Sequence, residues 1–226
     1  MPRNGRERNR IAYEYIHSTT KRSRGTSVLK SIAADQYHRL RPGQWLDDVM
    51  INEAITVLIH QTQAPNFHSR SSGWIVPCLQ VSPPDPSLAP RWYRRQHLLP
   101  GFRLLIPFHH RTHWSLFLVL QDPQLILHLD SSVGCFPPGV VESAYSVLVD
   151  LLCGESWGES DEWDLLEVSC VQQTNNCDCG VHVILNAAAI LDGDDPRQIR
   201  QFPPVSLDKR LSVTNLFLDH IRSFHR

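Results

Sequence analysis

The chain has 226 residues, of which 42% are hydrophobic and 20% are charged, and its formal net charge is −1. These values are ordinary for a globular protein and exclude a mostly disordered chain or a coiled coil. No apolar run approaches the ~20 residues that a membrane helix needs, so we expect no membrane span.

Basic residues gather at the N-terminal end. The first 24 residues contain seven Lys and Arg side chains and two Glu, whereas the rest of the chain has 15 basic and 21 acidic residues. We therefore interpret residues 1–26 as a basic, flexible arm and residues 27–226 as a single folded domain. The acidic body argues against a nucleic-acid partner, because a nucleic-acid-binding domain carries a basic face.

Cysteine usage bears on the compartment. Six cysteines are present, and the polar N-terminal segment lacks the apolar stretch of a secretory signal. Disulfide frameworks belong mainly to small secreted domains, so we expect free thiols. Together with the basic arm, this predicts an intracellular location in the nucleus or cytoplasm, or in the cytosol of a host cell for an effector. No feature indicates an oligomer, so we expect a monomer.

The first part of the chain predicts one helix between irregular segments. Residues 27–39 fit a short strand or a turn. From Trp45 to His60, apolar residues recur at helical spacing and acidic residues stand near the start, which predicts an amphipathic helix. Residues 61–90 are rich in Ser, Pro and Gln, which is typical of a loop or an insertion.

Three apolar runs then predict buried strands. Each run is short and is bounded by polar or turn residues. The runs are Leu104–Phe108, Trp114–Leu120 and Leu125–Leu129. Asp122 and Pro123 favour a hairpin turn between the last two strands.

The second half of the chain is mainly helical in pattern. An acidic loop over 154–164 and a short strand, Leu165–Ser169, separate the first of three predicted helices from the other two. The helices are Val140–Leu152, Gly180–Leu191 and Leu207–Phe224. The order of helices and strands indicates an α+β domain.

Four side chains, a Cys, a His, an Asp and a Gln, together indicate a site for nucleophilic catalysis. Cys179 precedes a helix, and a helix N-terminus favours the nucleophilic thiolate. If the two strands form a hairpin, His113 and Asp130 meet at its open end, as a general base and the group that orients it. A Gln side chain and the Cys179 backbone N–H can hold an oxyanion. Each residue alone has a common structural explanation, but the joint order is much rarer.

A zinc site is the alternative use of the cysteines. Cys170, Cys177, Cys179 and His182 could be drawn as a ligand set. Two ligands separated by one residue lack the gap of two to four residues that is usual in zinc sites. We therefore predict no metal and no cofactor.

Four segments together resemble a known family. They are W-L-D-D at 45–48, H-W-S-L at 113–116, D-S at 130–131 and Q-Q-T-N-N-C-D-C-G at 172–180. In kind, order and spacing they resemble the ubiquitin-like-protein protease family, the SUMO-protease/adenain group of cysteine peptidases. The resemblance spans roughly residues 28–195.

The resemblance implies a fold and a set of catalytic roles. The fold is α+β, the papain-like fold of the SUMO-protease type, with a central mixed sheet flanked by helices and the catalytic Cys at a helix N-terminus. Cys179 is implied as the nucleophile, His113 as the general base and Asp130 as its orienter. Gln173 is implied as the oxyanion donor, in preference to Gln172.

The resemblance also implies how a substrate is held. Trp45 and Trp114 match aromatic residues that cover a narrow tunnel for a Gly-Gly tail, where two indole faces exclude branched side chains. Asp48 matches an acid that pairs with an Arg of the modifier. The chain departs from the family pattern at Asp47, where Asn is common, and at Asn176, where Gly is usual.

A cysteine protease or isopeptidase is the function implied. It would cleave after the C-terminal Gly-Gly of a ubiquitin-like modifier, SUMO first and ubiquitin or the Nedd-type modifier second, in precursors or conjugates. Two alternatives stay open: an acetyltransferase of the same clan, which shares the acyl-thiol intermediate, and a modifier-binding module without turnover.

Overall fold

The computed structural model describes residues 36–64, 66–70, 87, 98, 100–154, 157–159, 162–197 and 209–223. The predicted arm over 1–26 and most of the predicted loop over 61–90 lie outside these residues. In chain order the elements are η1 (Gln36–Leu40), α2 (Asp48–Thr62), β1 (Phe67–Ser69), β2 (Arg103–His110), β3 (His113–Leu120), β4 (Leu125–Leu129), α3 (Val140–Gly154), β5 (Asp164–Val168), α4 (Cys179–Leu191) and α5 (Lys209–Ser223).

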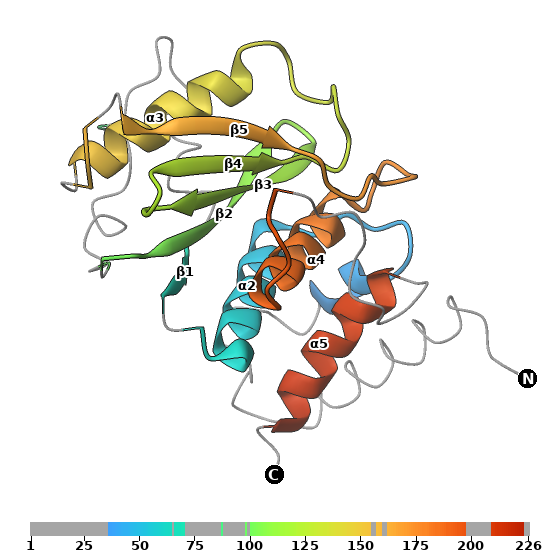
Figure 1. Cartoon of the computed structure of the whole chain (residues 1–226). Coiled ribbons are helices and arrows are strands. Elements are labelled where there is room, and N and C mark those ends of the chain that lie inside the picture. The colour runs from blue at the N-terminus through green and yellow to red at the C-terminus, as the bar shows by residue number, and fades with distance from the viewer. Residues whose placement is uncertain are drawn as a thin grey trace, which may run out of the picture.

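A mixed sheet of five strands in the order β1-β2-β3-β4-β5 forms the centre of the fold (Figure 1). β1 runs parallel to β2 and β5 parallel to β4, whereas β3 is antiparallel to both β2 and β4. The predicted hairpin is confirmed, with Leu116 opposite Leu129. The predicted α+β class and central mixed sheet are therefore confirmed.

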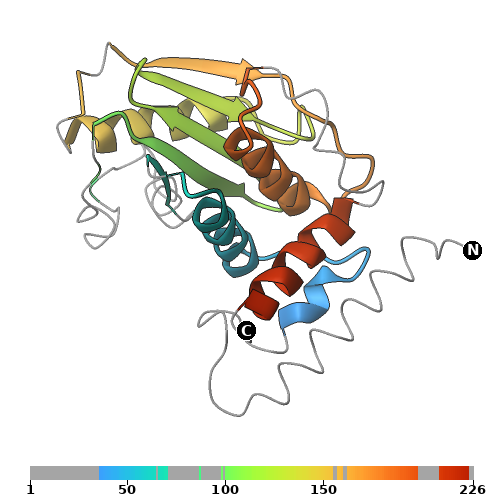
Figure 2. The same cartoon turned by 60° about the horizontal axis from the view of Figure 1, so that its bottom comes forward.

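Helices cover both faces of the sheet. α3 lies on one face, while α2 and α4 lie on the other with α5 packed outside them (Figures 1 and 2). Because successive strand residues point to opposite faces, β3 feeds both cores. Leu116 and Leu118 join the core beneath α2 and α4, whereas Phe117 and Val119 join the core beneath α3. This explains why residues 116–120 of β3 are an uninterrupted apolar run.

For one short element the structure decides between two predicted alternatives, and a second short element was not predicted. Within the described part of 27–39, the chain forms the single 3₁₀ turn η1 and no strand, because Tyr37 and Leu40, three residues apart, are both buried. β1 lies inside the predicted loop over 61–90, where Phe67 pairs with Arg103 and packs against the core. A three-residue edge strand carries too little periodicity to be recognised in a Ser/Pro-rich segment.

Helix ends follow local capping. α2 begins at Asp48 instead of Trp45, because Asp47 Oδ1 accepts a hydrogen bond from Met50 N at 3.0 Å. Asp and Asn serve equally well in this capping position, so the departure at Asp47 has no structural cost. None of the helices that the structure describes is both long enough and apolar enough to cross a membrane.

Candidate active site

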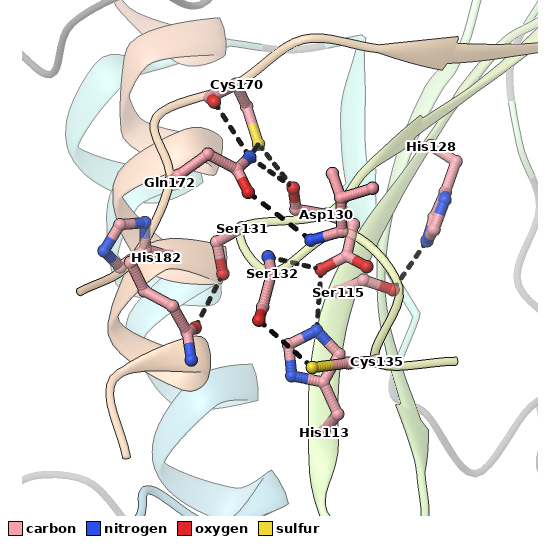
Figure 3. Close-up of polar contacts among 12 residues, drawn as sticks. His113, Ser115, His128, Asp130, Ser131, Ser132, Cys135, Cys170, Gln172 and His182 are labelled. Atoms are coloured by element: carbon pink, nitrogen blue, oxygen red, sulfur yellow. Dashed lines mark hydrogen bonds and ion pairs between the residues drawn. The ribbon is translucent and has the colours of Figure 1, made fainter. Parts of the chain in front are cut away.

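His113 and Asp130 meet where the β3–β4 hairpin opens. His113 is the first residue of β3, and Asp130 directly follows β4. His113 Nε2 donates to Asp130 Oδ1 at 2.6 Å, and the backbone N–H of Ser132 donates to the same oxygen at 2.8 Å (Figure 3). Both side chains are more than nine-tenths buried. Because Nε2 is bound to the carboxylate, Nδ1 is the nitrogen that remains for the thiol.

The thiol is at the N-terminus of a helix, as the sequence predicted. Cys179 is the first residue of α4, is 4% exposed and forms a side-chain hydrogen bond with His113. Asp178 occupies the N-cap position but makes no capping bond with its side chain. The amide donors of the first helical turn therefore receive no side-chain cap from Asp178 and point toward the region of the thiol.

The environment of His113 favours its protonated form. Burial lowers the pKa of the imidazole, but hydrogen bonds to Asp130 and Cys179 and the charges of the same two groups outweigh burial and raise the pKa to about 9. An imidazolium beside the thiol at neutral pH stabilises a thiolate. The three side chains can therefore form a thiolate–imidazolium pair oriented by a carboxylate.

Gln173 is fixed beside this group from two sides. Its backbone N–H donates to Ser131 O at 2.8 Å, and its Oε1 accepts from Ser131 Oγ at 2.9 Å. Its Nε2 donates to Asn175 O at 2.6 Å. Since Oε1 faces Ser131, the amide NH₂ points the other way, and an NH₂ group carries a second hydrogen that an oxyanion can accept.

Gln172 has a different arrangement. Its Nε2 donates to Asp130 O at 2.9 Å and to Cys170 O at 3.1 Å. Both amide hydrogens are therefore directed at backbone carbonyl oxygens, those of Asp130 and Cys170 (Figure 3). This geometry agrees with the preference for Gln173 over Gln172 as the oxyanion donor.

The loop before Cys179 is shaped by Asn175. Its Oδ1 accepts from the backbone N–H of Cys177 at 2.9 Å and of Asp178 at 3.0 Å, and its Nδ2 donates to Asp178 Oδ2 at 2.8 Å. An Asn side chain closes such a turn by imitating the backbone. Asn176 is not among the residues with positive φ, so this turn does not require the glycine that is usual in the family.

Arg210, in α5, is an anchoring residue that the sequence analysis missed. It is 3% exposed and binds Asp178 Oδ1 through Nε at 3.0 Å and also through Nη2. It further donates to the carbonyls of Arg39 and Gln44 at 2.7 Å each and to that of Cys177 at 3.3 Å. One guanidinium thus joins the loop before the thiol to the segment before α2. A basic residue in a polar helix gives no signal of this role from sequence.

Gly180 lets α4 approach that same segment closely. A Cβ at this position would lie 2.8 Å from Ile51 Cδ1 and 3.1 Å from Leu46 Cβ. The glycine after the thiol therefore allows close packing of α4 against the start of α2.

The residues predicted to hold a substrate lie at the β2–β3 end. Trp45 is 48% exposed just before α2, and Asp48 is exposed in the first turn of α2. Trp114 is buried and stacks on His109, with ring centroids 4.4 Å apart. Burial lowers the pKa of His109, while the charge of Asp48 opposes this. Trp45 and Trp114, both described, make no ring contact with each other.

The residues considered for zinc have separate structural contacts. Cys170 Sγ donates to Asp130 O at 3.2 Å, and burial raises its pKa to about 11. His182 Nδ1 donates to Val171 O at 2.9 Å, while burial and the charge of Lys209 lower its pKa to about 4. No group of three or more possible metal ligands occurs among the described residues.

Fold and site together define a cysteine peptidase. A thiol at a helix N-terminus, with a carboxylate-bound imidazole beside it, is the arrangement that nucleophilic thiol catalysis requires. Residues 91–218 match the Ulp1 protease family, C-terminal catalytic domain. The chain belongs to the Ulp1 protease family, which confirms the resemblance found in the sequence.

Solved structures share this fold at low identity. The C-terminal Ulp1 protease domain in complex with Smt3, the yeast ortholog of SUMO, is 20% identical with a TM-score of 0.69, over 97% of this chain and 95% of that one. The Chaetomium thermophilum Ulp1-like SUMO protease catalytic domain is 21% identical with a TM-score of 0.67, over 96% and 88%. The Xanthomonas campestris effector XopD bound to ubiquitin is 21% identical with a TM-score of 0.57, over 77% and 90%. The predicted SUMO-protease type of fold is thus confirmed. No curated protein sequence matches the chain significantly.

Proposed function

We propose that this chain hydrolyses the bond after the C-terminal Gly-Gly of a ubiquitin-like modifier, with SUMO as the first candidate. The observation that carries the proposal is the 2.6 Å bond between His113 and Asp130, with the Cys179 thiol close enough to raise the pKa of the same imidazole. This arrangement holds a nucleophile and a proton donor side by side.

The first half of the reaction forms an acyl-enzyme. The Cys179 thiolate attacks the carbonyl carbon of the last glycine, and the carbonyl oxygen becomes an oxyanion. The Gln173 amide and the Cys179 backbone N–H donate to that oxygen. As the C–N bond breaks, the His113 imidazolium gives its proton to the leaving amine, which is the lysine Nζ in a conjugate.

The second half restores the enzyme. The now neutral His113 accepts a proton from water, and the resulting hydroxide attacks the thioester carbon. The C–S bond breaks and releases the Cys179 thiolate together with the glycine carboxylic acid, which loses its proton to solvent. Asp130 keeps the imidazole in one orientation through both halves, because its Oδ1 is itself held by Ser132 N.

The modifier tail is proposed to lie between Trp45 and Trp114. An indole face packs well against an extended glycine backbone and leaves no room for branched side chains. Asp48, exposed at the start of α2, offers a carboxylate to an Arg of the modifier surface. His109 supports Trp114 from the side away from β4.

Two observations bear on the choice of modifier. Two of the structurally similar proteins are a SUMO protease domain and a protease domain bound to the yeast SUMO ortholog, which supports SUMO as the first candidate. A third is an effector bound to ubiquitin, which favours ubiquitin as the second. At about one-fifth identity the modifier has to be tested directly.

The test uses modifiers that carry a thiol-reactive vinyl ester in place of the last glycine carboxylate. SUMO, ubiquitin and the Nedd-type modifier are each incubated with the wild type, Cys179→Ala and Cys177→Ala. We expect a covalent adduct with SUMO, seen as a gel shift, in the wild type and Cys177→Ala and none in Cys179→Ala. The Cys177 variant is the matched control because that thiol lies only two residues away.

The other outcomes reject parts of the proposal. An adduct that persists in Cys179→Ala would exclude Cys179 as the nucleophile. An adduct with ubiquitin alone would replace SUMO by ubiquitin. Tight binding of a modifier with no turnover of its conjugates would favour a binding module, and formation of an acetyl-enzyme from acetyl-coenzyme A would favour the acetyltransferase alternative.

A further inference from the structure

A cavity of about 600 Å³ lies at the β4–β5 end of the sheet, and neither the proposed chemistry nor the modifier tail uses it. Its walls come from the ends of β4 and β5 and from the segment 133–142, which leads into α3. The volume falls within the roughly 300–1,000 Å³ that ligand-binding pockets occupy.

The cavity adjoins the catalytic imidazole on the side away from the tryptophans. Asp130, the partner of His113, lines it, and so does Phe136, whose ring centroid is 5.0 Å from that of His113. Phe136 packs into the core beneath α3, whereas Trp114 belongs to the core beneath α2 and α4. The Phe136 side of the cavity therefore lies on the opposite face of the sheet from Trp114, whereas Val168 and Cys170, which also line the cavity, pack with the core beneath α2 and α4.

The charged groups in the cavity wall have one sign. Asp130, Glu142 and Glu167 are its acidic residues, and no Lys or Arg is among the described residues that line it. Asp130 is bound to His113, so its charge is shared with the imidazole. Glu142 is exposed in the first turn of α3, and the Glu167 side chain is 60% exposed.

Glu167 is held in place by a buried pair. His128, which is 1% exposed, donates from Nδ1 to both Glu167 oxygens at 2.8 Å each, and its Nε2 shares a hydrogen bond of 2.8 Å with Ser115 Oγ. These contacts hold the Glu167 carboxylate in a fixed orientation.

The rest of the wall is apolar. Phe136, Val141 and Val168 contribute side chains, together with two prolines, Pro137 and Pro138. Apolar walls with carboxylates suit a side chain that has an aliphatic stem and a cationic end, because the stem packs on the walls while the end meets the carboxylates. Lys and Arg are the residues of that shape.

We propose that this cavity binds a lysine or arginine side chain of the protein from which the modifier is removed. The leaving amine takes its proton from His113, so the chain that departs lies on the His113 side of the thiol. The modifier tail is proposed to lie against Trp45 and Trp114, which leaves the cavity to the departing protein. Glu142 and Glu167 select a basic residue close to the modified lysine. This inference rests on the proposed function and adds a preference among conjugates.

The test compares substrates that differ only in the departing group. The first is SUMO with a C-terminal aminomethylcoumarin, which has no departing peptide. The others are SUMO joined through an isopeptide bond to peptides in which arginine, citrulline or glutamate occupies each position next to the modified lysine in turn. Wild type, Glu142→Gln, Glu142→Lys and Glu167→Gln are measured. Asp150→Asn, an exposed acid of α3 outside the cavity, is the matched control.

The expected result is a charge preference that depends on the cavity. At one or more positions the wild type and Asp150→Asn should cleave the arginine peptide about fivefold faster in kcat/KM than the citrulline peptide, the size of a partly exposed ion pair. Glu142→Gln and Glu167→Gln should each lose most of this preference, and Glu142→Lys should prefer the glutamate peptide. All variants should cleave the coumarin substrate as the wild type does.

Different failures reject different statements. Equal cleavage of arginine and citrulline peptides by the wild type at every position would overturn the inference, and so would a preference that survives in Glu142→Gln and Glu142→Lys. The Glu142 variants keep the test independent of folding, because Glu167 also holds His128. A wild type that cleaves neither the coumarin derivative of SUMO nor that of ubiquitin would reject the proposed function itself, and this inference with it.

Discussion

The proposed catalytic group is assembled from two regions that are held together in different ways. His113 and Asp130 stand at the ends of two paired strands, where the register of the sheet and two buried cores set their positions. Cys179 and Gln173 belong to a loop and the helix it opens, where polar contacts set the geometry. Apolar packing therefore fixes the first region, and hydrogen bonds fix the second.

Because the two regions are held differently, they differ in how sensitive they are to single substitutions. Strand ends embedded in a core tolerate changes at the surface, because many apolar contacts hold them. The loop before Cys179 depends on a few groups, chiefly Asn175 and the guanidinium of Arg210. Removing one buried charged partner leaves the other uncompensated, so a single substitution can disturb the whole loop.

Replacing Asp130, at the end of the paired strands, should lower catalytic activity most. We expect Asp130→Asn to lower kcat of SUMO–aminomethylcoumarin hydrolysis by about 10³–10⁴-fold, because the amide neither orients nor charges His113 as a carboxylate does. The thermal midpoint at neutral pH should also fall, because the variant loses stability that the His113 proton contributes beside Asp130. A kcat within tenfold of the wild type would contradict the assigned role.

Replacing Gln173, the proposed oxyanion donor in the loop before Cys179, should have the second largest effect on activity. Gln173→Ala is expected to reduce kcat by about 10²–10³-fold with KM nearly constant, because the lost hydrogen bond exists only in the transition state. Gln172→Ala should cost much less, since its amide binds carbonyls behind Asp130. Steady-state kinetics on both variants make the comparison, and a larger loss at Gln172 would reverse the assignment.

Substitutions at Arg210 test whether the loop before Cys179 depends on this residue of α5. Arg210→Met should destabilise the protein by about 3–5 kcal/mol, the usual cost of leaving a buried charge unpaired. Arg210→Lys keeps the charge but cannot reach both Asp178 and the carbonyls, so we expect a folded enzyme with about tenfold lower kcat. Urea unfolding and kinetics separate the two effects. A lysine variant with full activity would show that charge alone suffices.

The pH dependence of activity reports on His113, whose pKa depends on Asp130 from the first region and Cys179 from the second. His113 has its pKa raised to about 9, above its ordinary value of 6.5, so the imidazolium persists through neutral pH and is lost as the pH rises through about 9. We expect kcat/KM to fall about tenfold per pH unit above that point. The stability that this proton contributes is complete below about pH 6.5 and disappears over the same rise. Asp130→Asn should move the alkaline limb to lower pH, and an unmoved limb would assign it to another group.

Some predictions await other measurements. The basic arm over 1–26 lies outside the described residues, and the intracellular location and the monomeric state stay predictions. The expected loop over 61–90 is described only in part, and there it contains β1.

The sequence by itself determined the strands β2 to β5, the main helices and the pairing of His113 with Asp130. Long apolar periodicity and motif spacing are local properties of the chain, and a hairpin necessarily brings its two open ends together. Only the tertiary structure decided the role of Arg210, the stacking of His109 on Trp114 and the acidic cavity beside Asp130. These features join residues far apart in the chain, through contacts that depend on how helices and strand ends pack and that leave no periodic pattern in the sequence.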